Sequence, residues 1–107
     1  MVERRVSLRA KLDQTLWLNK YVEGFPHLAE LVEVSDSGLV IRTIREPSTR
    51  DTTFALELGI PGSAHRTWMW AELVRKSEKL QALRILHADL LERAQLRQLV
   101  RWSLAAA

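Results

Sequence analysis

Apolar and polar residues alternate along most of the chain, in short runs that are separated by turn-forming residues. Alternation of this kind predicts β-strands, because successive side chains on a strand point to opposite faces. The runs predict five or six short strands, at residues 10–18, 28–34, 39–44, 53–60, 67–75 and 80–87. Turn signals at 35–38 and 76–79 predict that two pairs of these strands form hairpins.

The last part of the chain follows a helical pattern. From residue 89 onward the chain is rich in leucine, glutamate, arginine, alanine and glutamine, which favour helices. Asp89 is placed as an N-cap, so we expect a helix at 89–104. The apolar residues of this helix spread around much of the helical wheel, which predicts that the helix is broadly buried. The alternative is that one face of the helix packs on the sheet and another face binds a partner. Short strands followed by a helix predict a small antiparallel barrel or sandwich, and closure into a barrel would leave no exposed edge strand.

Length and composition are those of one ordinary domain. The chain has 107 residues, of which 47% are hydrophobic and 27% charged. We divide it into a basic N-terminal arm at 1–9, a barrel at 10–88 and the terminal helix. No stretch approaches the roughly 20 apolar residues of a membrane span, so we expect no membrane association and no export by a signal peptide. The absence of cysteine excludes disulfides and thiolate metal sites and fits a cytoplasmic location.

No pattern typical of an enzyme is present in the sequence. The three histidines are too far apart for metal-ligand spacing: His27, His65 and His87. The four glycines form no phosphate-binding fingerprint, and no serine stands in a nucleophile elbow. We therefore expect a binding protein without catalytic residues, metal or cofactor.

Arginine is strongly preferred over lysine. The chain carries 16 basic and 13 acidic residues, a net charge of +3, and twelve of the basic residues are arginine. A guanidinium group pairs with phosphate or a guanine edge through two hydrogen bonds and stacks on rings, whereas an ammonium group supplies a compact charge. Genomic base composition explains the same preference equally well, so the positions of the arginines are more informative than their number.

Two polar segments stand out once position is considered. Arg4, Arg5 and Arg9 place three guanidinium groups within six residues, just before the first predicted strand. The turn at 35–38 has the sequence Ser-Asp-Ser-Gly. Taken singly, the first segment is typical of a solvated basic tail and the second of an ordinary turn between strands.

Together the two segments resemble the paired signature of the PilZ domain, the bacterial receptor for cyclic di-GMP. That signature is an Arg-x-x-x-Arg arm followed further along the chain by Asp or Asn-x-Ser-x-x-Gly. Arg5 and Arg9 match the first element, Arg4 matches an additional arginine that often precedes it, and Ser35 and Gly38 match the second. The resemblance extends over nearly the whole chain and implies a six-stranded antiparallel barrel with a C-terminal helix.

The resemblance also implies a ligand and a site. The expected ligand is cyclic di-GMP, and the expected site residues are Arg4, Arg5, Arg9, Glu33, Ser35 and Gly38. The arginines suit its phosphates and the Hoogsteen edges of its guanines, the Ser35 hydroxyl can donate a hydrogen bond, and the missing side chain of Gly38 lets the backbone approach the ligand. In this family an arginine at the position of Arg4 is associated with two stacked nucleotide molecules. Ordering of the arm on binding would then signal to a separate effector protein, in motility, adhesion or exopolysaccharide pathways.

One position departs from the pattern. Glu33 stands where the family has Asp or Asn, which keeps the charge but moves the carboxylate outward by one methylene group. The alternative is therefore a divergent PilZ module that works as a protein–protein adaptor without nucleotide. A third hypothesis is a small basic barrel that stacks single-stranded nucleic acid on Trp68 and Trp70, but interspersed acidic residues disfavour a continuous basic groove. We expect these two tryptophans, with Met69 facing the opposite side, to lie in the core or in the wall of the ligand pocket.

Overall fold

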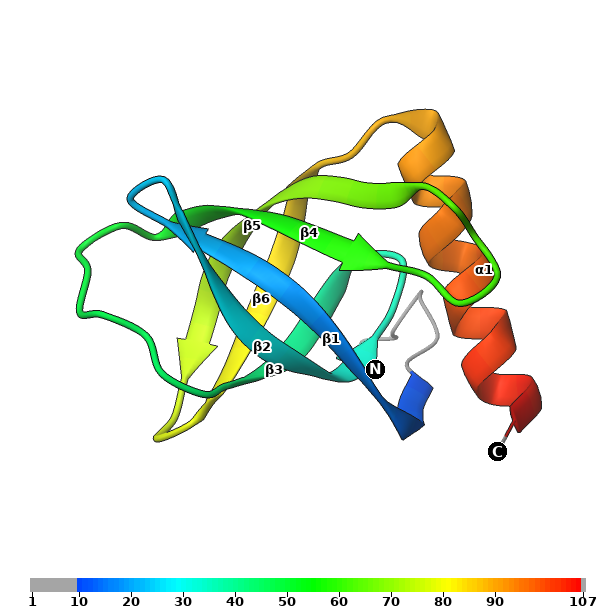
Figure 1. Cartoon of the computed structure of the whole chain (residues 1–107), viewed down its shortest axis with the longest axis horizontal. Helices are drawn as coiled ribbons and strands as arrows, with labels where there is room; N and C mark the ends of the chain where they lie inside the picture. Colours follow the sequence, from blue (N-terminus) through cyan, green and yellow to red (C-terminus); the bar gives the residue numbers. More distant parts are fainter. Residues whose placement is uncertain (1–9, 107) are drawn as a thin grey trace, which may run out of the picture.

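The computed structural model describes residues 10–106, with side chains described for 15–102. These residues form six strands and one helix: β1 (Ala10–Val22), β2 (Phe25–Val34), β3 (Gly38–Thr43), β4 (Thr53–Gly59), β5 (Arg66–Lys76), β6 (Leu80–His87) and α1 (Leu90–Ala106). The strands close into an antiparallel barrel in the order β1-β2-β3-β6-β5-β4 (Figure 1). The predicted six-stranded barrel with a terminal helix is confirmed, and the sandwich alternative is wrong.

Two long-range pairings close the barrel. β3 pairs with β6 around Leu39 and Leu83, and β1 pairs with β4 around Leu18 and Leu58. The hairpins expected at 35–38 and 76–79 join β2 to β3 and β5 to β6. The β1–β2 turn, the loop between β3 and β4 and the β5–β6 turn lie at the end of the barrel opposite α1, whereas the β2–β3 turn lies near α1 (Figure 1).

The first hairpin extends beyond its prediction. We expected the first strand to end at residue 18 and the second to begin at 28, but β1 continues to Val22 and β2 starts at Phe25. The connection is a tight turn in which Glu23 and Gly24 have φ values of 53° and 88°. Positive φ at two central residues gives the turn the twist that suits a hairpin, and the glycine adopts it without steric cost.

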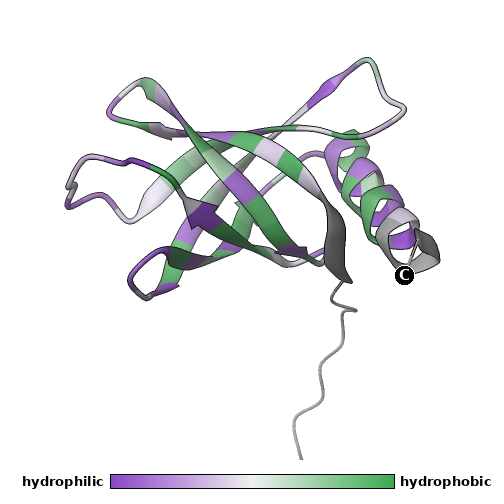
Figure 2. Cartoon of the chain, turned by 60° about the horizontal axis from the view of Figure 1, so that its bottom comes forward, coloured by the Kyte–Doolittle hydropathy of each residue, from purple (hydrophilic) through white to green (hydrophobic). Residues whose placement is uncertain are grey.

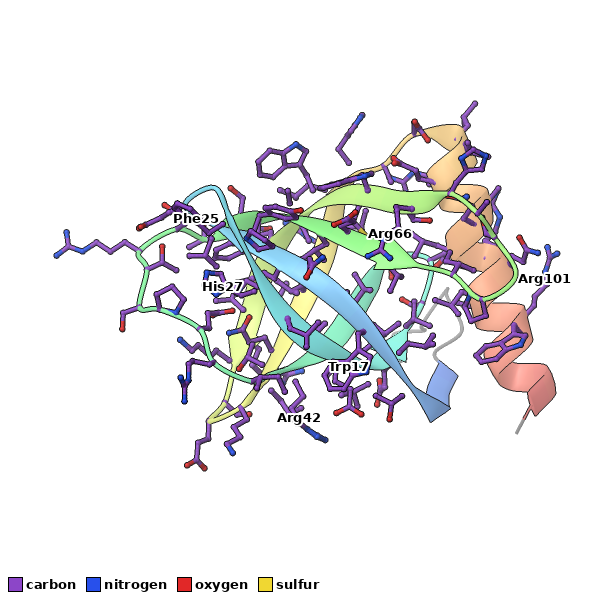
Figure 3. The ribbon with its side chains drawn as sticks, viewed as in Figure 1. Trp17, Phe25, His27, Arg42, Arg66 and Arg101 are labelled. Carbon is purple, nitrogen blue, oxygen red and sulfur yellow. The ribbon has the colours of Figure 1, made fainter. Side chains whose placement is uncertain are left out.

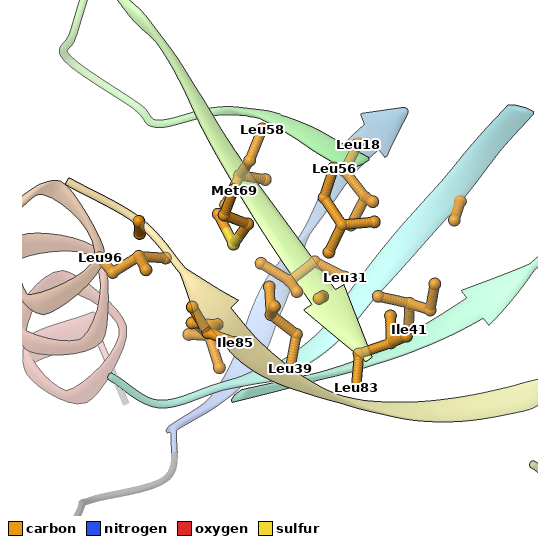
Figure 4. Close-up of a cluster of buried hydrophobic side chains, with 14 of the residues drawn as sticks. Leu18, Leu31, Leu39, Ile41, Leu56, Leu58, Met69, Leu83, Ile85 and Leu96 are labelled. Carbon is orange, nitrogen blue, oxygen red and sulfur yellow. The ribbon is translucent and has the colours of Figure 1, made fainter. Parts of the chain in front are cut away.

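Alternation along the strands decides which side chains fill the barrel. Figure 2 shows hydrophilic and hydrophobic residues alternating along the strand ribbons. The inward side chains form one core that β-strands and helix share, and several of them are drawn in Figure 4: Leu18, Leu31, Leu39, Ile41, Leu56, Leu58, Met69, Leu83, Ile85 and Leu96. A closed sheet buries these residues without leaving an unpaired strand edge.

Helix α1 covers the end of the barrel with one face. Leu96, Leu99 and Val100 are buried, while Leu90, on the opposite side, is 86% exposed. The expectation of broad burial is therefore wrong, because the helix lies on the surface and contacts the barrel along a single stripe. The part of the chain that the structure describes contains no helix long and apolar enough to cross a membrane.

The start of α1 is fixed by its own cap and by β5. The Asp89 side chain accepts a hydrogen bond from the Glu92 amide at 2.9 Å, and Glu92 Oε1 accepts one from the Asp89 amide at 3.2 Å. This reciprocal capping box confirms Asp89 as the N-cap. Glu92 Oε2 also accepts from the Trp68 amide at 2.9 Å, and the buried Thr67 hydroxyl donates to Gln95 at 2.7 Å. The helix is thus tied to the start of strand β5.

Candidate ligand site at the β2–β3 turn

The turn between β2 and β3 is built by Ser35. Its amide donates to the Gly38 carbonyl at 2.9 Å, and its buried hydroxyl oxygen accepts from the amides of Ser37 at 3.2 Å and Gly38 at 3.1 Å. These bonds satisfy backbone groups that the strands leave unpaired at the turn. Ser35 therefore has a structural role in shaping the turn, and its contact with a ligand stays a prediction.

Gly38 is required by the approach of β6. A Cβ atom added at this position would lie 2.6 Å from the carbonyl oxygen of Leu83, and the residue has no positive φ. The missing side chain therefore makes room for a neighbouring strand of the barrel. An unusual backbone angle does not explain this glycine.

Replacing Gly38 with alanine is expected to lower the free energy of unfolding by about 2 kcal/mol, because β3 and β6 must move apart to accommodate the new methyl group. Gly59→Ala is the matched control: its Cβ would meet the flexible end of Arg66 at 3.0 Å and no backbone atom. Denaturant unfolding should show the Gly59 variant within about 0.5 kcal/mol of the parent chain. Equal losses in the two variants would contradict the assignment.

The described chain enters the barrel beside this turn. Ala10, the first residue of β1, is paired with Val34, which directly precedes Ser35, and Lys11 is paired with Glu33. Glu33 is half-buried and also faces Val40 of β3, next to an irregularity in the β2 register. Glu33, Ser35 and Gly38 therefore lie together at the end of the barrel near α1. The other three predicted site residues lie outside the described residues: Arg4, Arg5 and Arg9.

Acidic groups are prominent around the turn. Glu33 and the exposed Asp36 both lie here, and Arg84 of β6 faces Gly38 across the β3–β6 pair. The Arg84 guanidinium is engaged in an ion pair with Glu72 of β5. The described side chains of the turn therefore offer an anionic ligand little net positive charge.

A buried polar cluster at the other end of the barrel was not predicted. The side chain of Lys20 is 1% exposed; its Nζ atom donates to Gln81 Oε1 at 2.7 Å, approaches Glu46 Oε1 at 3.0 Å, and lies 3.9 Å from the centre of the Phe54 ring. Gln81 Nε2 donates to Glu46 Oε2 at 3.0 Å, which completes the cluster. Burial lowers the pKa of Lys20 below its ordinary value, although Glu46 opposes this shift.

The Lys20 cluster ties a loop to the barrel. Glu46 belongs to the loop between β3 and β4, and its carboxylate shields the ammonium group from solvent. A sequence signal for it exists, because Lys20 lies at an alternate position between the inward-facing Leu18 and Val22. This alternation can be recognised in the sequence only when the first predicted strand is extended to Val22.

The tryptophans of β5 lie on the outer face of the barrel. Trp68 and Trp70 are 41% and 51% exposed, with Met69 buried between them, so placing them in the core is wrong. The Trp68 ring packs against Tyr21 of β1, with ring centroids 5.4 Å apart. Arg66, the basic residue nearest along β5, is paired with Glu57 at 3.2 Å. Exposed rings suit nucleic-acid stacking, but this charge pairing disfavours a polyanion on the same face.

The barrel resembles solved structures, although its sequence matches no family model and no curated protein. One similar structure is the PilZ domain of YcgR from Escherichia coli with c-di-GMP, at a TM-score of 0.79 and 16% sequence identity, covering 97% of this chain and 94% of that one. The chain has the fold of a PilZ domain. The fold that the two sequence motifs implied is thereby confirmed.

Two further structures share this PilZ fold. The Bacillus subtilis inhibitor of motility MotI (DgrA) gives a TM-score of 0.71 at 21% identity over 97% of this chain, which spans 53% of that protein. The PilZ domain of CeSA from a cellulose-synthesizing bacterium gives 0.67 at 11% identity, covering 89% of this chain and 96% of that domain. Likeness at these identities establishes the PilZ fold, and the ligand is a separate question.

Proposed function

We propose that this PilZ-fold chain is a receptor for cyclic di-GMP that binds the nucleotide between its N-terminal arm and the β2–β3 turn. Binding then changes how the domain meets a separate partner protein. The observation that carries the proposal is the register of β1 and β2, which brings the chain into the barrel opposite Val34, directly beside the Ser35–Gly38 turn. The described chain therefore begins beside the second half of the signature, and we assign the first half, the arm, to the same end of the barrel.

Chain geometry supports a site shared by arm and turn. An extended chain spans about 3.4 Å per residue, so residue 9 is one step and residue 5 about five steps from Ala10. Guanidinium groups at these positions have the reach to contact a ligand of nucleotide size seated on the turn. Arg5 and Arg9 are assigned to the phosphates and guanine edges, and Arg4 to a second, stacked nucleotide.

Electrostatics support the same division of roles. The turn carries the exposed Asp36, and Arg84 is paired with Glu72, so the described residues of the turn offer a dianion no unpaired cation. Three arginines on the arm supply the missing positive charge. Glu33 is then suited to accept hydrogen bonds from the N–H groups of a guanine, which is the role a carboxylate fork performs well.

The comparisons agree with this proposal. The PilZ domain of YcgR was solved with c-di-GMP, and MotI is an inhibitor of motility. We propose that this chain acts in motility, adhesion or exopolysaccharide pathways, and the likeness to MotI supports the first of these. The adaptor function without nucleotide remains the second candidate, and the observation that favours it is Glu33 at the position where the signature has Asp or Asn.

Titration calorimetry with cyclic di-GMP tests the proposal. We expect saturable heat with a dissociation constant in the micromolar range or below, and a stoichiometry of two nucleotides if Arg4 has its assigned role. A folded chain that gives no binding heat at these concentrations would contradict the proposed receptor function. If Glu33→Asp then restores binding, the natural chain is an adaptor that has lost the ability to bind the nucleotide.

A further inference from the structure

The outward face of α1 carries an organised row of side chains. Residues separated by three or four positions share one side of a helix, and Leu90, Ala94, Arg97 and Arg101 follow this spacing. All four are exposed, and they lie opposite the buried stripe of Leu96, Leu99 and Val100. We name these four residues the α1 ridge.

Positive charge on the α1 ridge is not compensated within the described residues. Three of the four arginines on the described strands are paired with carboxylates, Arg42 with Glu30, Arg66 with Glu57 and Arg84 with Glu72, and Arg75 is the exception. In the part of the chain that the structure describes, no ion pair or hydrogen bond involves the side chain of Arg97 or Arg101. Figure 3 shows Arg101 pointing away from the barrel.

The single acidic residue of α1 does not neutralise the ridge. Glu92, the carboxylate of its first turn, is engaged by the amides of Trp68 and Asp89. Arg93, one turn before Arg97, donates from Nε to the Ala88 carbonyl at 3.2 Å. Among the described residues, Arg97 and Arg101 are therefore two exposed cations without an ion-pair partner, about 6 Å apart along the helix axis.

Apolar surface adjoins these cations at the start of the helix. Leu90 and its neighbour Leu91 are 86% and 62% exposed, which is unusual for two consecutive leucines. About 10 Å of helix separates Leu90 from Arg97. An apolar anchor followed by two positive charges is the complement of a segment with an apolar side chain followed by two carboxylates.

We propose that the α1 ridge docks an acidic helical segment of a partner protein, with an apolar side chain on Leu90 and Leu91 and carboxylates on Arg97 and Arg101. A membrane surface fits less well, because a helix that lies in lipid turns its apolar stripe outward, and α1 turns it toward the barrel. A nucleic acid fits less well, because the ridge begins with the exposed Leu90 and carries no aromatic ring for stacking. The docking surface is separate from the β2–β3 turn, so this proposal does not rest on nucleotide binding there.

The test uses a synthetic helical peptide with two leucines followed by glutamates spaced four residues apart. Titrated into the isotope-labelled full chain, it should shift amide resonances between residues 90 and 101. Arg97→Glu with Arg101→Glu should weaken binding about tenfold or more, since two attractions become repulsions, and added salt should weaken it further. If those reversals perturb the helix, Arg97→Gln with Arg101→Gln should still weaken binding several-fold.

Matched controls separate docking from general attraction to a basic protein. Arg45→Glu with Arg50→Glu changes the net charge equally, but these exposed residues lie in the loop at the barrel end opposite α1, so peptide binding should be nearly unchanged. The proposal is overturned if the peptide does not bind, if a glutamine version binds as well, or if both double variants weaken it equally. Preferential binding of oligothymidylate or anionic lipid vesicles to the ridge overturns it too. The ridge variants should not change the heat of cyclic di-GMP binding. Failure of the docking proposal therefore leaves the receptor proposal intact.

Discussion

Replacing Glu46 with alanine should lower the free energy of unfolding by about 3 kcal/mol. Among the described residues, Glu46 supplies the one carboxylate that contacts Lys20, whose side chain is 1% exposed inside the barrel. Without Glu46 the buried ammonium group must remain charged without a counter-ion or release its proton, and either outcome destabilises the fold. The expected loss of unfolding free energy lies at the low end of the range for broken buried ion pairs, because Gln81 and the Phe54 ring still contact the Nζ atom of Lys20. Denaturant unfolding followed by tryptophan fluorescence measures it.

Two further variants define the origin of this loss. Lys20→Met combined with Glu46→Leu removes both charges and should leave stability within about 1 kcal/mol of the parent chain, since apolar replacements of buried pairs are tolerated. Glu72→Ala breaks the exposed pair with Arg84 and should cost less than about 1 kcal/mol. If the double variant is as unstable as Glu46→Ala, loss of loop packing and not the unpaired charge explains the effect.

The strand pattern and the chemistry of the turns made most of the fold predictable. Period-two alternation located all six strands, Ser35 and Gly38 marked the β2–β3 hairpin, and Asp89 marked the start of α1. These signals are local, since each depends on a few consecutive residues. The first strand was predicted too short because Lys20 interrupts an otherwise apolar inward face, and a charged residue at such a position is rare.

Features that depend on contacts between distant strands were not predictable. Alternation places Trp68 and Trp70 on one face of β5 but does not say which face is inward. The narrow interior of a six-stranded barrel accepts the flexible Met69, and the two large indoles remain outside. The need for glycine at position 38 depends on the approach of Leu83 from β6, and the partners of Lys20 come from a loop and from β6. The signature residues were found by resemblance, but their structural roles were not.

Replacing Arg5 and Arg9 together with alanine should weaken the binding of cyclic di-GMP about 100-fold or more. Each guanidinium is assigned at least one charge-assisted hydrogen bond to the nucleotide, and such bonds contribute about 1.5–3 kcal/mol each. The described surface of the site cannot replace them, because Glu33 and Asp36 are acidic and Arg84 is paired with Glu72. Titration calorimetry of the parent and the double variant measures the difference.

A matched pair of arginines controls for net charge. Arg45→Ala with Arg50→Ala removes the same charge from the loop at the end of the barrel away from α1 and should change affinity less than about threefold. Unfolding midpoints of both double variants should equal that of the parent, so that weaker binding reflects the site. Undiminished affinity of the Arg5 and Arg9 variant would place the nucleotide elsewhere.

The most direct test of the central claim is the position of the nucleotide on the barrel. Cyclic di-GMP titrated into the isotope-labelled chain should shift amide resonances of the Ser35–Gly38 turn, of the start of β1 opposite Val34 and of Arg84, while those of Trp68, Trp70 and the α1 ridge stay in place. Shifts centred on the exposed tryptophans of β5, or no shifts at nucleotide concentrations far above the micromolar range, would contradict a receptor site formed by the arm and the β2–β3 turn.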